Sequence, residues 1–212
     1  AAAVRERVGD SIDIMTDFHG RPQSIDAAKA YIDVIAPIRP LFVEEAIQPG
    51  NTPAMADLAR RVDCPLATGE RLFTPREFAE IAETRAVAYI QPDLAHCVGF
   101  SGGRRIAAIA EAAGIGVCPH NPMGPVAGAV ALQFDVATPN FVIQEEAVGL
   151  VPWFRDICSA YPLDLVDGFW HAPEAPGLGI EIDEAAAATH PFEQEIIPAM
   201  EAGLPDGTVA HW

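Results

Sequence analysis

A short apolar segment followed at once by an acidic residue or a histidine recurs six times in the chain, and this repeat is the strongest constraint on its fold. The six polar residues are separated by 27, 26, 23, 27 and 25 positions, about the length of one strand, one helix and two loops. The segments are nearly continuous in apolar residues, as strands are when helices cover a parallel sheet. They are Ile12–Thr16 before Asp17, Leu41–Val43 before Glu44, Leu66–Gly69 before Glu70, Val87–Pro92 before Asp93, Gly116–Pro119 before His120, and Phe141–Gln144 before Glu145.

The gaps between these segments contain signals for helices. Six strand–helix units predict an α/β fold, an incomplete TIM-type (β/α) barrel spanning residues 1–150. An open doubly wound sheet is the competing architecture, although no GxGxxG motif follows a strand. The helix signals are Ser24 as an N-cap, Thr52-Pro53, the capping box Thr74-Pro75-Arg76-Glu77, the stretch from Ser101 to Ala113 closed by Gly114, and Met123 to Phe134.

The repeat stops after Gly149, and residues 151–212 read as a tail that packs on the barrel rather than as a separate domain. The tail is expected to contain short strands and turns over 164–171 and 176–183, a short helix over 184–188, and a hairpin turn at Asp206-Gly207.

The net charge of the chain limits the classes of molecule that it is expected to bind. It has 212 residues, with 13 Lys+Arg against 30 Asp+Glu and a net charge of −17, which argues against binding to nucleic acid or to an anionic membrane. No apolar run approaches the ~20 residues of a membrane-spanning helix, and the charged first ten residues do not resemble a signal peptide. The four cysteines lack a CxxC pattern, so we expect free thiols in a reducing, cytoplasmic setting.

Three carboxylates follow three successive predicted strands. Because the carboxyl ends of parallel strands open on one edge of a barrel, Asp17, Glu44 and Glu70 are expected to converge. A site made of oxygen ligands suits a hard cation, and Mg²⁺ is the ion expected here. The alternative is that these acids are solvated loop residues or helix caps, but the same placement in three consecutive units favours a site.

Two histidines stand near the same edge. Strand alternation predicts that His19 shares a face with Asp17 and points into the barrel mouth. Asp93 and His120 end two neighbouring strands, and a carboxylate beside an imidazole produces a general base. A structural Asp–His hydrogen bond is the alternative interpretation.

These residues resemble motifs of the enolase superfamily, in the mandelate racemase and muconate lactonizing branch, with acid-sugar dehydratases of the galactonate dehydratase type as the nearest match. The resemblance covers nearly the whole chain. It is carried by residues 17–21, 41–45, 67–73, 90–94, 119–125, 143–146, 177–183 and 206–210.

The resemblance implies roles for the polar residues. It makes Asp17, Glu44 and Glu70 the Mg²⁺ ligands. It also implies a base, His120, that removes the proton beside the substrate carboxylate.

The remaining implied roles complete a dehydration. Asp93 is the partner of His120, and His19 is the acid that protonates the departing 3-hydroxyl. Glu145 hydrogen-bonds a substrate carboxylate oxygen. The implied reaction converts a sugar acid into a 2-keto-3-deoxy acid through an enediolate.

The resemblance also implies what accompanies this chain. Family members begin with a separate capping domain and two further barrel strands, so residues 1–150 correspond to strands three to eight, without the N-terminal capping domain. Ala46 stands where the family usually has proline, and residues 93–97 lack the lysine base of the lactonizing branch. A racemase or epimerase of α-hydroxy acids and a non-catalytic barrel fragment are the alternatives, and a homo-oligomer is expected for the full-length protein.

Overall fold

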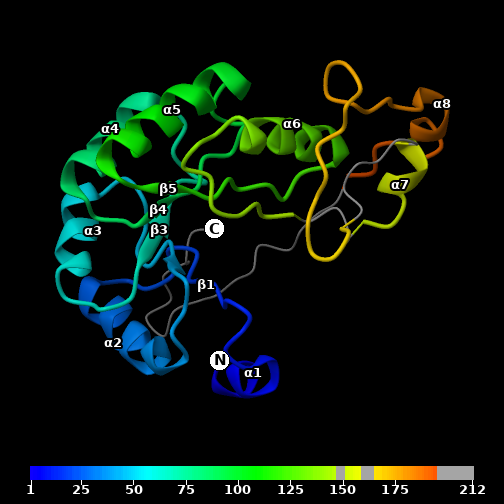
Figure 1. The fold of residues 1–212 in the computed structure, drawn as a ribbon. Helices are drawn as coiled ribbons and strands as arrows, with labels where there is room; N and C mark the ends of the chain where they lie inside the picture. Colours follow the sequence, from blue (N-terminus) through cyan, green and yellow to red (C-terminus); the bar gives the residue numbers. More distant parts are fainter. Residues whose placement is uncertain (147–150, 159–164, 195–212) are drawn as a thin grey trace.

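The computed structural model of the chain describes residues 1–146, 151–158 and 165–194. Five short parallel strands form one sheet in the order β1-β2-β3-β4-β5, and helices follow the strands in regular alternation (Figure 1). The strands are β1 (Thr16–Asp17), β2 (Val43–Glu44), β3 (Leu66–Thr68), β4 (Tyr89–Ile90) and β5 (Gly116–Val117). This arrangement confirms the predicted α/β fold as part of a barrel of the TIM type.

The sixth predicted strand is reduced to a single parallel bridge between Val117 and Phe141. Val117 donates to the carbonyl of Asn140 at 2.9 Å, and Val142 donates back to Val117 at 2.9 Å. The segment after Thr138 therefore lies beside β5 and continues the sheet by one position.

The strands are shorter than the apolar segments that predicted them. The segment Ile12–Thr16 was expected to be a strand throughout, but β1 begins only at Thr16. β1 is the first strand of the sheet order, and β2 is its only strand neighbour in the described part of the chain. Ile12 and Met15 are exposed there, so the incoming chain lacks the second neighbour that would extend the pairing.

The helices form where the capping signals predicted them, with three corrections. Asn51 rather than Thr52 caps its helix, because the Asn51 side chain accepts from Ala54 at 3.1 Å. The fourth and fifth of the predicted helices begin at Gly99 and Pro125 rather than at Ser101 and Met123. The helices are α1 (Ala2–Val8), which the sequence did not predict, α2 (Ile25–Ile35), α3 (Thr52–Ala59), α4 (Pro75–Thr84), α5 (Gly99–Ala113) and α6 (Pro125–Val136), with a 3-10 turn η1 (Ala36–Ile38) after α2.

The predicted caps of α2, α4 and α5 are present in the structure. Ser24 accepts from the backbone of Ala27, and Thr74 and Glu77 form a reciprocal capping box. Gly114 ends α5 in the left-handed conformation, with φ of 72°, which glycine adopts without steric cost.

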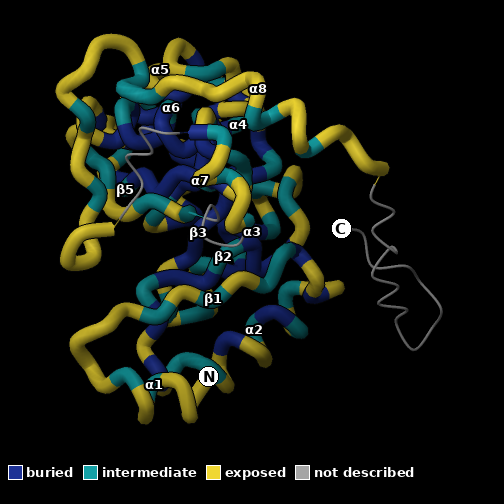
Figure 2. Tube along the Cα trace, turned by 90° about the vertical axis from the view of Figure 1, so that its right-hand side faces the viewer, coloured by how far each residue is buried: buried dark blue, intermediate teal, exposed yellow. Residues whose placement is uncertain are grey.

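The core lies between the sheet and its helices. Figure 2 shows buried positions gathered along the strands and along the helix sides that face them. Large side chains from four helices and one strand are almost fully covered there: Ile32, Leu58, Phe78, Ile90 and Ile106. The polar strand ends are thus carried by a packed apolar layer beneath them.

The tail contacts the barrel units through α6. Leu132 of α6 packs against Phe154 and Trp170, and helices α7 (Phe154–Ile157) and α8 (Glu184–Ala187) lie beyond α6 in Figure 1. Residues 176–183 form turns and bends without a strand, contrary to expectation, and Val166 and Phe169 make one antiparallel bridge. The hairpin expected at Asp206-Gly207 lies outside the described residues.

The four cysteines are free, as predicted, and three of them are buried. In the part of the chain that the structure describes, no helix is long and apolar enough to cross a membrane.

Asp135 of α6 is a buried carboxyl group whose Oδ1 atom has no hydrogen-bond partner. Burial raises the pKa of Asp135 to about 8, because the charged form loses its hydration. The folded chain therefore holds a proton that the unfolded chain releases near pH 4, and folding stability falls as pH rises towards 8.

Asp135→Asn should remove this pH dependence, because the amide keeps the shape of the side chain without its charge. The variant should gain free energy of unfolding over the parent, and this gain should grow by on the order of 2–3 kcal/mol between pH 5.5 and 8.5. Urea unfolding at both pH values measures it, with Asp63→Asn as the exposed control. A gain that is the same at both pH values would show that Asp135 does not titrate in this range.

Candidate functional site

The parallel register brings the polar strand ends together. Asp17 pairs with Glu44 across β1 and β2, and Glu70 follows β3 by two residues. Asp93 and His120 each follow the next strands by three residues. These five strand-end residues therefore gather at one edge of the sheet, as the repeat predicted.

Glu70 is the central side chain of this edge. Its Oε1 atom lies 3.4 Å from Nδ1 of His19, and its Oε2 atom lies 3.5 Å from Nε2 of His120. Glu70 is only 7% exposed. The two histidines thus contact different oxygens of one buried carboxylate, from strands on either side of it.

His19 reaches this position through a turn. Its φ is 50°, a left-handed conformation that is uncommon outside glycine. Its backbone nitrogen donates to Asp17 Oδ1 at 2.6 Å, and its Nδ1 lies 3.4 Å from Asp17 Oδ2. The predicted proximity of His19 to Asp17 is therefore present, but the strand alternation that predicted it is not.

Asp93 and His120 form a hydrogen-bonded pair, with Asp93 Oδ2 at 2.9 Å from His120 Nδ1. The other oxygen of Asp93 accepts from the backbone nitrogens of Ala95 at 2.7 Å and His96 at 3.2 Å. Asp93 is buried, so these bonds fix its orientation and that of the ring.

The electrostatics of the pair favour a charged imidazole. Burial opposes the charge on His120, but the Asp93 hydrogen bond and the carboxylates of Glu145 and Glu70 outweigh it and raise the pKa of His120. Burial also opposes the charge on Asp93, which by itself would raise the pKa of that carboxyl group. The His120 hydrogen bond and the neighbouring imidazole and backbone groups outweigh burial, and the pKa of Asp93 is lowered overall. The surroundings thus stabilise the protonated form of His120, which a base needs in order to hold the proton that it removes.

Glu145 lies beside the pair. Its Oε2 atom accepts from the backbone nitrogen of Asn121 at 3.0 Å and lies 3.9 Å from His120 Nε2. The preceding residue, Gln144, donates to the carbonyl of Pro119 at 2.9 Å. The segment that carries Glu145 is thereby held against the segment that carries His120.

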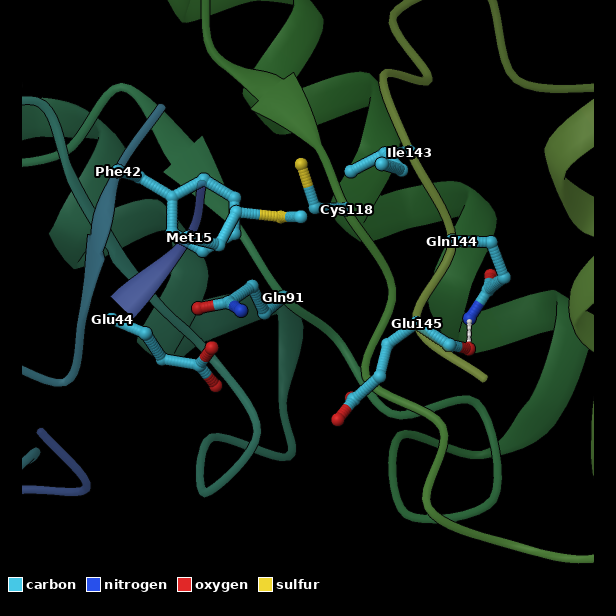
Figure 3. A pocket seen from close by; sticks show the side chains of 8 residues that line it. All are labelled: Met15, Phe42, Glu44, Gln91, Cys118, Ile143, Gln144 and Glu145. Atoms are coloured by element: carbon cyan, nitrogen blue, oxygen red, sulfur yellow. Dashed lines mark hydrogen bonds between the residues drawn. The ribbon is translucent and has the colours of Figure 1, made fainter. Parts of the chain in front are cut away.

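Glu44 faces a cavity of about 220 Å³ inside the curved sheet (Figure 3). Burial raises the pKa of Glu44 to about 8, the negative charges of Asp17 and Glu70 act in the same direction, and a hydrogen bond with Gln91 opposes them. Three carboxylates thus crowd one place. The cavity is lined by Met15, Phe42, Glu44, Gln91, Cys118, Ile143, Gln144 and Glu145.

Sequence reasoning missed a buried ion pair at this edge. Glu45 is fully buried, and both of its carboxylate oxygens accept from Arg71, with Nε at 3.1 Å from Oε1. Glu45 directly follows Glu44, and Arg71 directly follows Glu70, and these two acids end neighbouring strands. Opposite charges at matching positions of adjacent units were the signal that could have predicted the pair.

Residues 1–186 match the family described as enolase C-terminal domain-like. The match covers all seven residues of the predicted site. The chain belongs to this family. The recognition of the mandelate racemase and muconate lactonizing branch of the enolase superfamily is thereby confirmed.

Solved structures of the family agree with the fold. A mandelate racemase/muconate lactonizing enzyme from Sulfitobacter sp. is 37% identical, with a TM-score of 0.86 over 91% of this chain and 48% of that chain. A protein described as similar to these enzymes, from Roseovarius sp., is 36% identical, with a TM-score of 0.86 over 91% of this chain and 48% of that chain.

An enolase from Agrobacterium radiobacter, named as a candidate galactarate dehydratase and containing Na and L-malate, is 33% identical. Its TM-score is 0.82, over 99% of this chain and 56% of that chain. This enolase C-terminal domain-like chain therefore spans about half the length of the solved relatives.

Members of the enolase superfamily are lyases and racemases that bind Mg²⁺. Two sets of side chains at this edge have the right chemistry for such an ion, and Glu70 belongs to both. His19, Glu45 and Glu70 place one donor atom each within 4.8 Å of one another, but both oxygens of Glu45 are engaged by Arg71. Asp17, Glu44 and Glu70 offer hard oxygen donors whose mutual repulsion a cation would relieve, so this second set fits Mg²⁺ better.

Proposed function

We propose that this chain carries the reaction site of a Mg²⁺-dependent hydro-lyase that dehydrates a sugar acid of the galactonate type to a 2-keto-3-deoxy acid. The observation that supports it most is the pair of histidines that contact the two oxygens of Glu70. Elimination of water needs a base on one carbon and an acid for the leaving hydroxyl on the next, and the two rings stand where those roles can be divided.

His120 acts as the base that removes the proton at C2. Asp93 holds Nδ1 of the ring, which leaves Nε2 on the side of Glu70 and Glu145. The Asp93 carboxylate stabilises the imidazolium once the proton has arrived. The backbone bonds to Asp93 keep the ring in place throughout.

His19 acts as the acid for the departing 3-hydroxyl. Its ring lies on the other side of Glu70, next to Asp17, so a substrate that sits over Glu70 meets one histidine on each side. Glu145 stands beside His120, where its protonated carboxyl group donates a hydrogen bond to a carboxylate oxygen of the substrate.

Asp17, Glu44 and Glu70 would hold the Mg²⁺. When bound, the ion supplies the positive charge that stabilises the oxygens of the substrate carboxylate as negative charge builds on them.

A racemase or epimerase of α-hydroxy acids is the second candidate, because solved relatives are named mandelate racemase/muconate lactonizing enzyme. Two groups that flank one carbon also serve racemisation, in which one removes the proton and the other returns it. The candidates differ in product: loss of water gives a 2-keto acid, whereas racemisation gives the mirror-image or epimeric hydroxy acid.

A library of sugar acids, screened in D₂O with Mg²⁺, tests the proposal. We expect a 2-keto product from at least one acid, measured on the 212-residue chain and on the longest natural chain that contains it. Inversion or deuterium uptake at C2 without a 2-keto product would favour the racemase, and no reaction with any acid would favour a non-catalytic fragment.

Glu44→Gln and Glu70→Gln should each remove most of the Mg²⁺ affinity, because each replaces an anionic ligand with a neutral amide. Isothermal titration with Mg²⁺ alone measures this without a substrate. Glu80→Gln is the matched control, since Glu80 is an exposed residue of α4 that pairs with Arg76. Parental affinity in both site variants would contradict the ligand assignment.

The two histidines should fail at different steps. His120→Asn should stop both deuterium exchange at C2 and product formation. His19→Asn keeps the base, so exchange should continue while dehydration falls by roughly 10²–10⁴-fold, the usual contribution of a general acid. Proton NMR of the substrate in D₂O measures both rates in one sample, provided that the proton on His120 exchanges with solvent before it returns. Loss of exchange in the His19 variant with intact Mg²⁺ binding would contradict this division of roles.

A further inference from the structure

A chain of polar side chains runs from the buried ion pair to the turn that carries His19. Arg71 binds both oxygens of Glu45 and also donates from its other terminal nitrogen to Gln48 Oε1 at 3.2 Å. Gln48 in turn donates to the carbonyl of Gly20 at 2.9 Å. The guanidinium is therefore linked to the backbone of the residue directly after His19.

The turn is held from a second direction by the backbone of Glu45. The nitrogen of Gly20 donates to the Glu45 carbonyl at 2.7 Å. Both the backbone nitrogen and the carbonyl oxygen of Gly20 are therefore hydrogen-bonded. A Cβ atom at Gly20 would lie 2.6 Å from a terminal nitrogen of Arg71 and 2.9 Å from Nε2 of Gln48. The side chains of Arg71 and Gln48 thus pack directly on the turn, and they leave no room for a side chain at position 20.

The backbone of this turn needs such support. His19 and Glu45 are non-glycine residues with φ of 50° and 36°, conformations that persist only when their surroundings over-determine them. The hydrogen bonds and side-chain contacts of Gly20 hold the backbone of His19 in this conformation. Arg71 also reaches the partner of His19, because its Nε lies 3.7 Å from Glu70 Oε1, the oxygen that contacts the His19 ring.

We propose that Arg71, acting through Glu45 and Gln48, is a positioning residue that fixes the His19 turn against Glu70. The guanidinium suits this task because its planar fork engages a carboxylate and a further acceptor at once. The inference rests on the proposed function in one respect, namely that His19 is the acid whose placement matters. In this arrangement Glu45 serves Arg71 and is not a ligand of the metal ion.

Gln48→Leu is the sharpest variant, because it cuts the link to Gly20 and leaves the buried pair of Glu45 and Arg71 intact. Arg71→Met alone would leave a buried carboxylate without its partner, so the double variant Glu45→Gln/Arg71→Met removes both charges together. Arg76→Met makes the same change at an exposed arginine of α4 and serves as the control. Thermal unfolding verifies that each variant folds.

The first measurement is the ratio of dehydration to C2 deuterium exchange. A displaced acid slows loss of the hydroxyl but leaves the base in place, so the ratio should fall by roughly tenfold to a hundredfold in Gln48→Leu and in the double variant. A residue that only stabilises the fold would lower both rates together. Mg²⁺ affinity should stay at the parental value in Gln48→Leu and in the double variant.

The second measurement needs no substrate and decides the inference even if the proposed function fails. The ring signals of His19 in a ¹H–¹³C spectrum, assigned by their loss in His19→Asn, should move or broaden in Gln48→Leu and in the double variant, while those of His120 stay in place. Arg76→Met should leave both unchanged. Unmoved His19 signals in both variants would overturn the inference. Loss of Mg²⁺ affinity in the double variant with unmoved His19 signals would instead assign Glu45 as a metal ligand.

A parent that exchanges deuterium but never dehydrates any acid would refute the dehydratase and leave the spectroscopic result standing. A parent that dehydrates, with variants that keep its ratio and its His19 signals, would refute the positioning role alone. The two failures are therefore distinguishable.

Discussion

The crowding of carboxylates at one edge of a parallel sheet is the constraint on which the rest of this site depends. The register that pairs Asp17 with Glu44, and that places Glu70 on the next strand, leaves three acids close together above an apolar core. Burial then raises the pKa of Glu44 to about 8. Positive charge at this edge comes from Arg71, whose Nε lies 3.7 Å from Glu70 Oε1, and, in the proposed function, from the Mg²⁺ that the carboxylates would hold.

The same crowding explains why the two histidines differ. His120 follows β5 by three residues and is fixed by a buried aspartate whose other oxygen accepts from two backbone nitrogens. His19 stands on a strained turn and depends on contacts from neighbouring loops. In the proposed reaction the base must hold one orientation through repeated proton transfers, and the buried, hydrogen-bonded Asp93 provides it. The proposed acid, His19, gains from a turn, because a turn can bring its ring across to the carboxylate that His120 also contacts.

The repeat made much of this predictable, and the exceptions have physical causes. The order of the units, the caps of α2 and α4, and the meeting of Asp93 with His120 follow from local spacing and parallel pairing. The ion pair of Glu45 and Arg71 was missed although its residues stand at matching positions of two neighbouring units, because the predicted pattern included only the strand-end residues and not the residue after each of them. The turn at His19 was missed because strand alternation says nothing of a positive φ after the strand has ended. The tail was predicted least well, since it has no periodic pattern and is held by a few contacts to α6.

The commitment of Arg71 to Glu45 has a consequence for any anionic substrate. The chain has a net charge of −17, and the guanidinium nearest Glu70 is already engaged by a buried carboxylate and by Gln48. If the chain acts on a sugar acid as proposed, attraction for that anion must therefore come largely from the ion that the strand-end carboxylates would hold. Binding of the ion and of the substrate would then be linked, each strengthening the other by the same factor. In that proposal the buried pair does more than support a turn. Because Arg71 neutralises Glu45, the ion would meet the charge of the three proposed ligand acids alone, and it would still attract the anionic substrate.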